Sequence, residues 1–346
     1  MEMLNSASML LSFDLWAWIL NGFSKWIINY GWMIIVFTII LKLVMTPLDV
    51  YQRIFSKKQA KVNEVLQPEM KKLQEKYAND KNKLNIEQQK LYKKYNVGLG
   101  GTCLSMLLTM GVSMLVFFTL FSSLRKVGNE KLYDSYQMLD TVCVQTIGAD
   151  QKISNITDED ELNTLRVEIK KEYKQVQNKY SWLWVKNVWK PDSNTSQFVS
   201  FEDYAKHKKF NETEKEIAKE RYNFITETID GKEQSNNGYY ILMILAVVIS
   251  FGSQFLSIKV LSPKGQKLNT MNWVMMAIIP LSMIFFAWKS NVVFTIYIIL
   301  NSLMSVLISM AITLILNKID KNKPGENILL KNKNVEVVEY SRNYKK

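Results

Sequence analysis

The fold is decided by residues 27–48, which read IINYGWMIIVFTIILKLVMTPL. This run holds one charged residue, Lys42, among side chains that are almost all apolar. A membrane-spanning helix needs about 20 mostly apolar residues, because the hydrocarbon core is about 30 Å thick. The run therefore predicts a first membrane span, which Pro47 is expected to end or kink.

Four further apolar runs have the length of a span: residues 100–125, 239–258, 271–288 and 292–316. Lys/Glu/Asn-rich stretches separate them, and this segregation indicates a membrane protein although the mean hydropathy is only −0.07. We therefore expect an all-α membrane protein with five transmembrane helices, a cytoplasmic helical hairpin and a helical extracellular insertion.

Positive charge predicts the orientation, because cytoplasmic loops of membrane proteins carry an excess of Lys and Arg. Residues 49–99 hold 12 Lys or Arg against 6 Asp or Glu, and residues 259–270 hold three Lys and no acid. The basic tail at 317–346 holds 8 against 4. We place all three in the cytoplasm, so that the N-terminus and residues 126–238 lie outside.

The segments outside the spans read as helical. Residues 1–26 alternate Trp and Leu with polar residues, which predicts a helix in the membrane interface, with a degenerate extra span as the alternative. Residues 49–99 have helical apolar spacing on both sides of a break at Asn79–Asp80, which predicts a hairpin of two antiparallel helices. The hairpin residues of interest are Gln67, Pro68, Glu69, Asn79, Asp80 and Tyr92.

The insertion at 126–238 has few apolar residues, so we expect a small, loosely packed domain. Residues 158–180 have helix-former composition, and Asn211 with Glu214 resembles a capping box before a second helix. Between these helices, residues 181–192 contain three Trp. They are typical either of an aromatic belt at the outer interface or of a small soluble core.

Composition excludes several function classes. The formal net charge of +12 is typical of contact with acidic phospholipids, with ribosomal RNA as the alternative partner, although no RNA-binding module signature accompanies it. We expect no DNA partner. Two cysteines, Cys103 and Cys143, and a single His207 argue against a disulfide, a metal site and His-based catalysis. We expect no catalytic residue and no cofactor. The predicted spans lack Asp and Glu, which argues against a proton-coupled transporter.

Lys42 is the most informative residue, and it has two interpretations. Its ammonium group either reaches the lipid headgroups or faces a wet cavity inside the helix bundle. Polar residues in the other spans favour a hydrated, cytoplasm-facing groove when taken together. The candidate groove residues are Thr38, Lys42, Thr46, Ser105, Thr109, Gln254 and Asn301, and the same spans also carry Ser113, Ser250, Ser253 and Ser302.

Several motifs in order resemble the core of the YidC-family membrane protein insertases, over a little more than half of the chain. They are Gly31–Trp32 with Leu41–Lys42–Leu43–Val44–Met45–Thr46–Pro47–Leu48, then Leu66–Gln67–Pro68–Glu69, Leu91–Tyr92–Lys93–Lys94, Gly100–Gly101–Thr102–Cys103, Trp182–Leu183–Trp184 with Asp192, and Leu261–Ser262–Pro263. The Lys, Asn and Ile content is typical of a Gram-positive or wall-less bacterium with an AT-rich genome.

The resemblance implies a non-enzymatic insertase and chaperone with a positively charged groove in a bacterial cell membrane. Its implied partners are nascent membrane proteins and the bilayer, with the Sec translocon and the translating ribosome as further partners. Lys42 stands where the family has an arginine, Thr109 where it has Gln, and Gly111 where it has Pro. A polytopic transporter or channel, and a ribosome-recruiting scaffold, are the competing functions.

Overall fold

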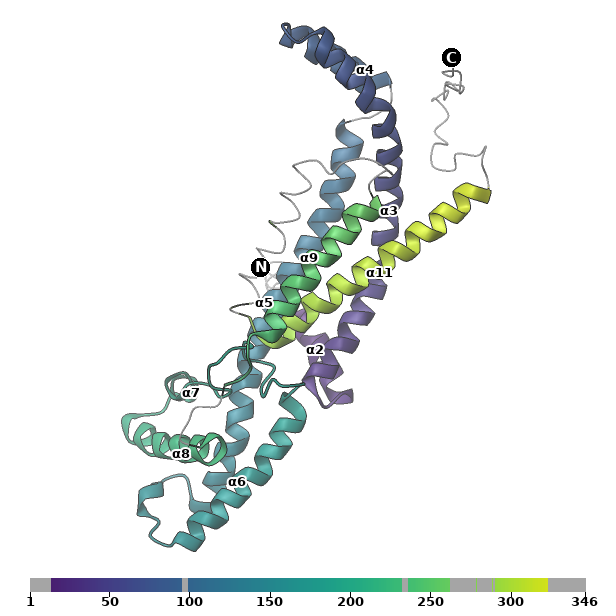
Figure 1. Ribbon diagram of the computed structural model, residues 1–346. Coiled ribbons are helices and arrows are strands. Elements are labelled where there is room, and N and C mark those ends of the chain that lie inside the picture. The colour runs from purple at the N-terminus through teal and green to yellow at the C-terminus, as the bar shows by residue number, and fades with distance from the viewer. Residues whose placement is uncertain are drawn as a thin grey trace, which may run out of the picture. The chain divides into compact units, whose positions relative to one another are not determined.

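The computed structural model describes residues 14–94, 99–231, 236–261, 278, 288 and 290–322. Within these residues the chain is helical, and its β-type pairing is limited to two isolated bridges. The elements are α2 (Leu15–Trp26), α3 (Tyr30–Lys76), α4 (Lys81–Lys94), α5 (Leu99–Ile147), η1 (Ile153–Asn155), α6 (Glu159–Tyr180), α7 (Phe201–Lys208), α8 (Glu212–Asp230), α9 (Ile241–Leu261) and α11 (Val292–Asn322) (Figure 1). The all-α prediction is confirmed for this part of the chain.

Three helices contain apolar segments long enough to cross a membrane. These segments are Tyr30–Gln52 in α3, Gly111–Ile147 in α5 and Val292–Ile319 in α11. Helix α9 contains a shorter apolar segment, Ile241–Ser257. The predicted span at 271–288 lies outside the described residues, apart from two isolated positions. Membrane-length helices are therefore present, and the five-helix core stays a prediction.

Two helices run beyond the ends that hydropathy predicts for them. Helix α3 continues through Pro47 and Pro68 to Lys76, and α5 continues past residue 125 to Ile147. Apolar composition ends where a helix leaves hydrocarbon, whereas its backbone hydrogen bonds continue wherever the residues are good helix formers. Each proline removes one backbone donor, and the helix continues beyond that loss.

The chain forms two compact units, and the first contains the insertion. This unit comprises Met1–Leu43, Val116–Gly252 and Met275–Met304, and the second comprises Val44–Leu115, Ser253–Val274 and Ser305–Lys346. In the first unit, one cluster of buried apolar side chains joins the apolar helices to the insertion. Its members include Met33, Leu124, Leu165, Ile225, Leu242 and Phe294. The insertion therefore shares its core with the apolar helices.

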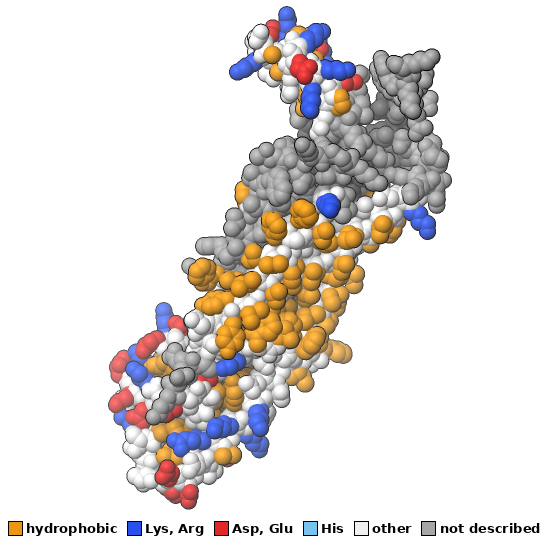
Figure 2. Space-filling view, in the orientation of Figure 1, with side chains coloured by type: hydrophobic (Ala, Val, Ile, Leu, Met, Phe, Trp, Pro, Cys, Tyr) orange, Lys and Arg blue, Asp and Glu red, His pale blue; other side chains and the backbone are white. Residues whose placement is uncertain are grey.

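The surface of this unit divides by chemistry. Hydrophobic side chains gather on the apolar helices, whereas charged side chains gather on the insertion (Figure 2). On α9 and α11 the exposed apolar residues include Ile244, Val248 and Leu303. An apolar exterior on these helices is what contact with lipid requires.

Helix α2 packs on the first unit through one face. Asp14 caps it by accepting a hydrogen bond from the backbone N–H of Ala17, and it also accepts one from Ser123 on α5. The ring of Phe37 on α3 lies edge-on to Trp16 and Phe23, at centroid distances of 6.1 and 6.0 Å. At 12 residues, α2 is about 18 Å long, which is shorter than the hydrocarbon core.

Side-chain caps begin the helices of the insertion. Asp158 caps α6. The capping box of Asn211 and Glu214 at the start of α8 is confirmed, because each side chain accepts from the other residue's backbone N–H. In the Trp-rich segment, Trp189 is buried in the core, whereas Trp182 and Trp184 are half-buried at its edge. The core interpretation therefore holds for Trp189.

A buried ion pair ties α8 to the end of α5. Arg221 on α8 places its Nε 2.9 Å from Oδ1 of Asp140, and both side chains are less than a tenth exposed. The Tyr204 hydroxyl donates to the second carboxylate oxygen at 3.1 Å, and Arg221 also donates to the carbonyl of Ala149. Burial raises the pKa of Tyr204, so its hydroxyl stays protonated as a donor.

We expect Arg221→Met to destabilise the protein by about 3–5 kcal/mol, because it leaves the Asp140 carboxylate buried without its cation. Thermal unfolding of detergent-solubilised protein measures this loss. Lys152→Gln is the matched control, since it breaks the exposed ion pair between Lys152 and Glu216 and should leave the melting temperature unchanged. Equal melting of the Arg221→Met and wild-type proteins would contradict the assigned role of the buried pair.

Candidate functional site

The polar face of α3 is the centre of the candidate site. Thr38, Lys42 and Thr46 follow one another at intervals of four, which places them on one side of the helix. The Thr38 hydroxyl is buried and donates to the carbonyl oxygen of Ile34 at 2.6 Å, so it is satisfied within its own helix. Lys42 is only 9% exposed, and Thr46 is half-buried.

Lys42 lies near the middle of its apolar segment. The segment Tyr30–Gln52 extends about 18 Å on one side of Lys42 and about 15 Å on the other, at 1.5 Å per residue. The sequence places Lys42 close to the cytoplasmic end of a predicted span at 27–48, and that placement stays a prediction. The burial of Lys42 is consistent with a lysine inside the helix bundle.

Helices α9 and α11 contribute a second pair of polar residues. The hydroxyl oxygens of Ser250 and Ser302 lie 3.3 Å apart, and Ser250 is buried. Gln254 follows Ser250 by four residues on α9, and both Gln254 and Asn301 are half-buried. The structure therefore brings Ser250 and Ser302 together. Ser105 and Thr109 belong to α5, but their side chains lie outside the described residues.

The predicted hairpin residues lie in the second unit, within α3 (67–69), within α4 (Tyr92) and in the break between these helices (79–80). Helix α3 ends at Lys76, and Asp80 accepts a hydrogen bond from the backbone N–H of Lys83 at 3.0 Å at the start of α4. Gln67, Pro68, Asn79 and Asp80 are exposed, whereas Glu69 and Tyr92 are half-buried. The exposed residues are accessible to a partner, and the antiparallel hairpin stays a prediction.

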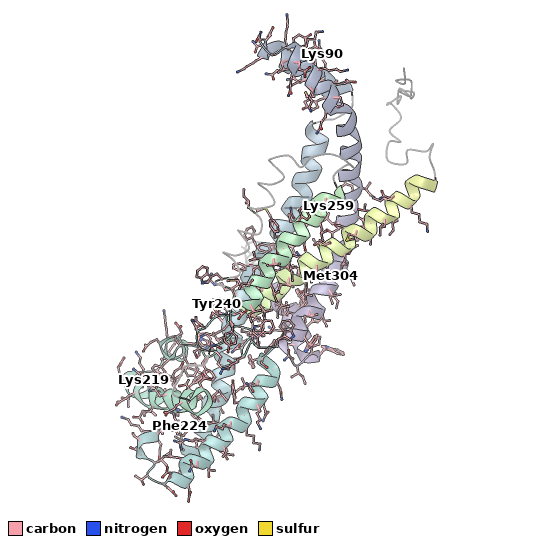
Figure 3. All side chains as sticks on the ribbon, viewed as in Figure 1. Lys90, Lys219, Phe224, Tyr240, Lys259 and Met304 are labelled. Carbon is pink, nitrogen blue, oxygen red and sulfur yellow. The ribbon has the colours of Figure 1, made fainter. Side chains whose placement is uncertain are left out.

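One loop, residues 187–192, caps the start of two apolar helices. The Asp192 carboxylate accepts hydrogen bonds from the backbone N–H groups of Tyr240 at 3.1 Å and Leu242 at 2.7 Å, at the end of α9 opposite Lys259 (Figure 3). The carbonyl oxygen of Lys190 accepts from Val292 at 2.9 Å, at the start of α11. The first amides of both helices thereby bond to protein.

A buried pair of asparagines holds this loop in place. The side-chain oxygen of Asn237 accepts from the backbone N–H of Asn187 at 2.8 Å, and its amide donates to the Asn187 carbonyl at 2.9 Å. Asn187 also donates to the Ser135 hydroxyl on α5 at 3.1 Å. Sequence reasoning missed these residues, because about 50 positions separate the partners and no local motif joins them.

The side chain of Lys190 bonds the loop to the residues that follow it. Its ammonium group donates to the carbonyl oxygens of Ser196, at 2.7 Å, and Phe198. Burial lowers the pKa of Lys190 to about 8, although the nearby Asp203 opposes that shift. Lys190 therefore links the loop to Ser196 and Phe198, and its pKa lies just above neutral pH.

Comparison with known proteins gives one family and several relatives. The family is described as 60Kd inner membrane protein, and the match covers residues 22–321. A membrane protein insertase YidC of Fusobacterium nucleatum is 39% identical over 109 residues, which are 32% of this chain and 49% of that protein. The insertase YidC of Clostridium tetani is 39% identical over 90 residues, 26% of this chain and 39% of that protein. The chain thus spans about half or less of the length of these relatives.

The lowered pKa of Lys190 predicts that the protein becomes more stable as the pH rises from 8 to 10. The unfolded chain keeps this proton up to a pKa near 10.5, so it binds more protons than the folded chain in that window. The free energy of unfolding should rise by on the order of 2 kcal/mol, and this slope should vanish in Lys190→Met. Melting temperatures at several pH values measure it, and equal slopes in both proteins would contradict it.

Proposed function

Because the chain belongs to the 60Kd inner membrane protein family, we propose that it is a membrane protein insertase and chaperone. It passes polar segments of its clients through a hydrated groove while their apolar helices enter the lipid. The observation that carries this proposal is Lys42, a lysine buried near the middle of an apolar segment. The relatives from Fusobacterium nucleatum and Clostridium tetani bear the name membrane protein insertase.

The mechanism follows from the cost of moving polar groups through hydrocarbon. Each unsatisfied backbone group in the bilayer core costs several kcal/mol, so a wet groove lowers the barrier for a client's polar segment. The Lys42 ammonium attracts acidic residues of that segment across a region of low dielectric constant. Partitioning of the client's apolar helix into lipid then drives the process without nucleotide hydrolysis, so the protein is not an enzyme.

The proposed core has five membrane helices with the N-terminus outside and the C-terminus in the cytoplasm. The excess of Lys and Arg at 49–99, 259–270 and 317–346 supports this orientation. Capping of α9 and α11 by residues 187–192 supports a groove that is closed on the outer side. Thr38, Thr46, Ser105, Thr109, Gln254 and Asn301 are the polar groups proposed to line it.

The proposed partners are nascent membrane proteins and the lipid of a bacterial cell membrane. The exposed hairpin residues and the basic tail are proposed to contact the Sec translocon and the translating ribosome. Such contacts depend on surface charge and therefore weaken as the salt concentration rises.

Four variants at Lys42 test the groove. In cells depleted of the native protein, wild type and Lys42→Arg should restore insertion of a single-span client with a short acidic outer tail. Lys42→Ala should lower insertion several-fold, and Lys42→Glu should nearly abolish it, because it repels the acidic tail. Protease protection of the client's tail measures insertion at matched expression levels.

Two controls separate the groove from general damage. Lys25→Glu changes an exposed lysine on α2 and should leave insertion intact. A client whose acidic tail residues are changed to amides should lose its dependence on Lys42. Equal insertion by all Lys42 variants would contradict the groove mechanism. Failure of wild type to restore insertion would favour a transporter or a ribosome-recruiting scaffold.

A further inference from the structure

A tight turn in the insertion presents an apolar side chain to the exterior at a conformational cost. Trp182 and Val185 exchange backbone hydrogen bonds of 2.9 and 3.0 Å, which leaves Leu183 and Trp184 at the tip of the turn. Leu183 has a φ of 53°, in the left-handed region where glycine is the usual residue. A non-glycine residue in this conformation costs about 1–3 kcal/mol. Its side chain is nevertheless 65% exposed.

The position of this turn is set by its contact with the start of α3. The side chain of Trp182 lies so close to Gly31 that a Cβ atom at Gly31 would overlap it. The rings of Trp182 and Trp32 meet nearly at right angles, with a centroid distance of 6.4 Å. Gly31 and Trp32 are the second and third residues of the apolar segment that begins at Tyr30. The turn therefore lies beside the start of this apolar segment.

Asn29 fixes this arrangement through both ends of its amide. Its nitrogen donates to the carbonyl oxygens of Asn178 at 2.9 Å and Ser181 at 2.8 Å, at the end of α6. Its oxygen accepts from the backbone N–H groups of Gly31 and Trp32, at the start of α3. These bonds tie the end of α6, directly before the turn, to the start of α3.

The surroundings of the turn match a lipid interface. Trp26, Ile28 and Trp32 are all more than half exposed around the start of α3, and Trp is enriched where hydrocarbon meets headgroups. Lys25 is exposed beside Trp26, and Lys186 follows the turn, so cationic groups stand where lipid phosphates would lie. Depth, apolar exposure and charge together point to lipid rather than to a protein partner.

We propose that the turn 182–185 inserts Leu183 into the acyl region of the leaflet at the N-terminal end of α3 and so fixes the insertion to the membrane surface. In the proposed orientation this is the outer leaflet. The contact does not depend on the insertase activity. It gives the strained turn a role, because only an apolar residue at its tip gains free energy from lipid.

Depth measurement at Leu183 tests the proposal. Leu183→Cys is made in the full chain with Cys103→Ser, while Cys143 stays buried and unlabelled. A bimane label is attached and the protein is placed in vesicles of phosphatidylcholine and phosphatidylglycerol. Val167→Cys on α6 is the matched control, because Val167 is apolar and 66% exposed.

Brominated acyl chains should lower the emission from position 183 by about half, while iodide in the buffer should quench position 167 instead. Strong iodide quenching at 183, with none from brominated lipid, would overturn the proposal.

The substitution Gly31→Ala tests whether the contact between Gly31 and Trp182 positions the turn. The added Cβ should displace Trp182 and at least halve the lipid quenching at position 183, whereas Gly22→Ala, which meets open space, should not. Unchanged quenching in Gly31→Ala would show that the contact between Gly31 and Trp182 does not set the depth.

Discussion

The first amides of an apolar helix need hydrogen-bond partners that hydrocarbon does not supply, and the first unit is organised around meeting that need for α9 and α11. The loop 187–192 provides the acceptors, from the Asp192 carboxylate and the Lys190 carbonyl. Asn187 and Asn237 in turn hold the loop by reciprocal hydrogen bonds. A single short segment thus lets two apolar helices begin inside protein rather than in water, and its position decides where both helices start.

The need to cap α9 and α11 makes the insertion an integral part of the first unit. The capping loop belongs to the insertion, and buried residues of α6 and α8 share one apolar cluster with α3, α5, α9 and α11. Tyr30 illustrates the connection, since its ring meets Tyr180 at the end of α6 and Trp189 in the capping loop at centroid distances of 5.1 and 5.2 Å. Removing the insertion would expose the helix starts that it caps. Changes in the insertion should therefore be felt at the membrane helices, and a deletion is a poor way to ask what the insertion does.

Local signals in the sequence predicted local structure, but they did not predict contacts between residues that are distant in the chain. Asn211 marked the start of α8, because a capping side chain bonds amides only a few residues away, and helix-former composition located α6. Hydropathy located the apolar helices but not their ends, since it reports the solvent around a helix and not the hydrogen bonds within it. Asp192 lies about 50 residues from the amides it caps, so nothing in its local sequence predicted that role.

The capped end and the buried lysine together define what the proposed groove must do. Tyr30, packed against the capping loop, and Lys42 lie on one helix about 18 Å apart. A client residue held at Lys42 would have this distance left to cross, instead of the full hydrocarbon thickness of about 30 Å. A groove open through to the exterior would remove the barrier for ions as well as for clients. In the proposed groove, bonded helix starts at one end and a cation near the middle would instead shorten the path for a polar segment while keeping the membrane closed. The remaining distance would be the part that the client's own apolar helix must drive.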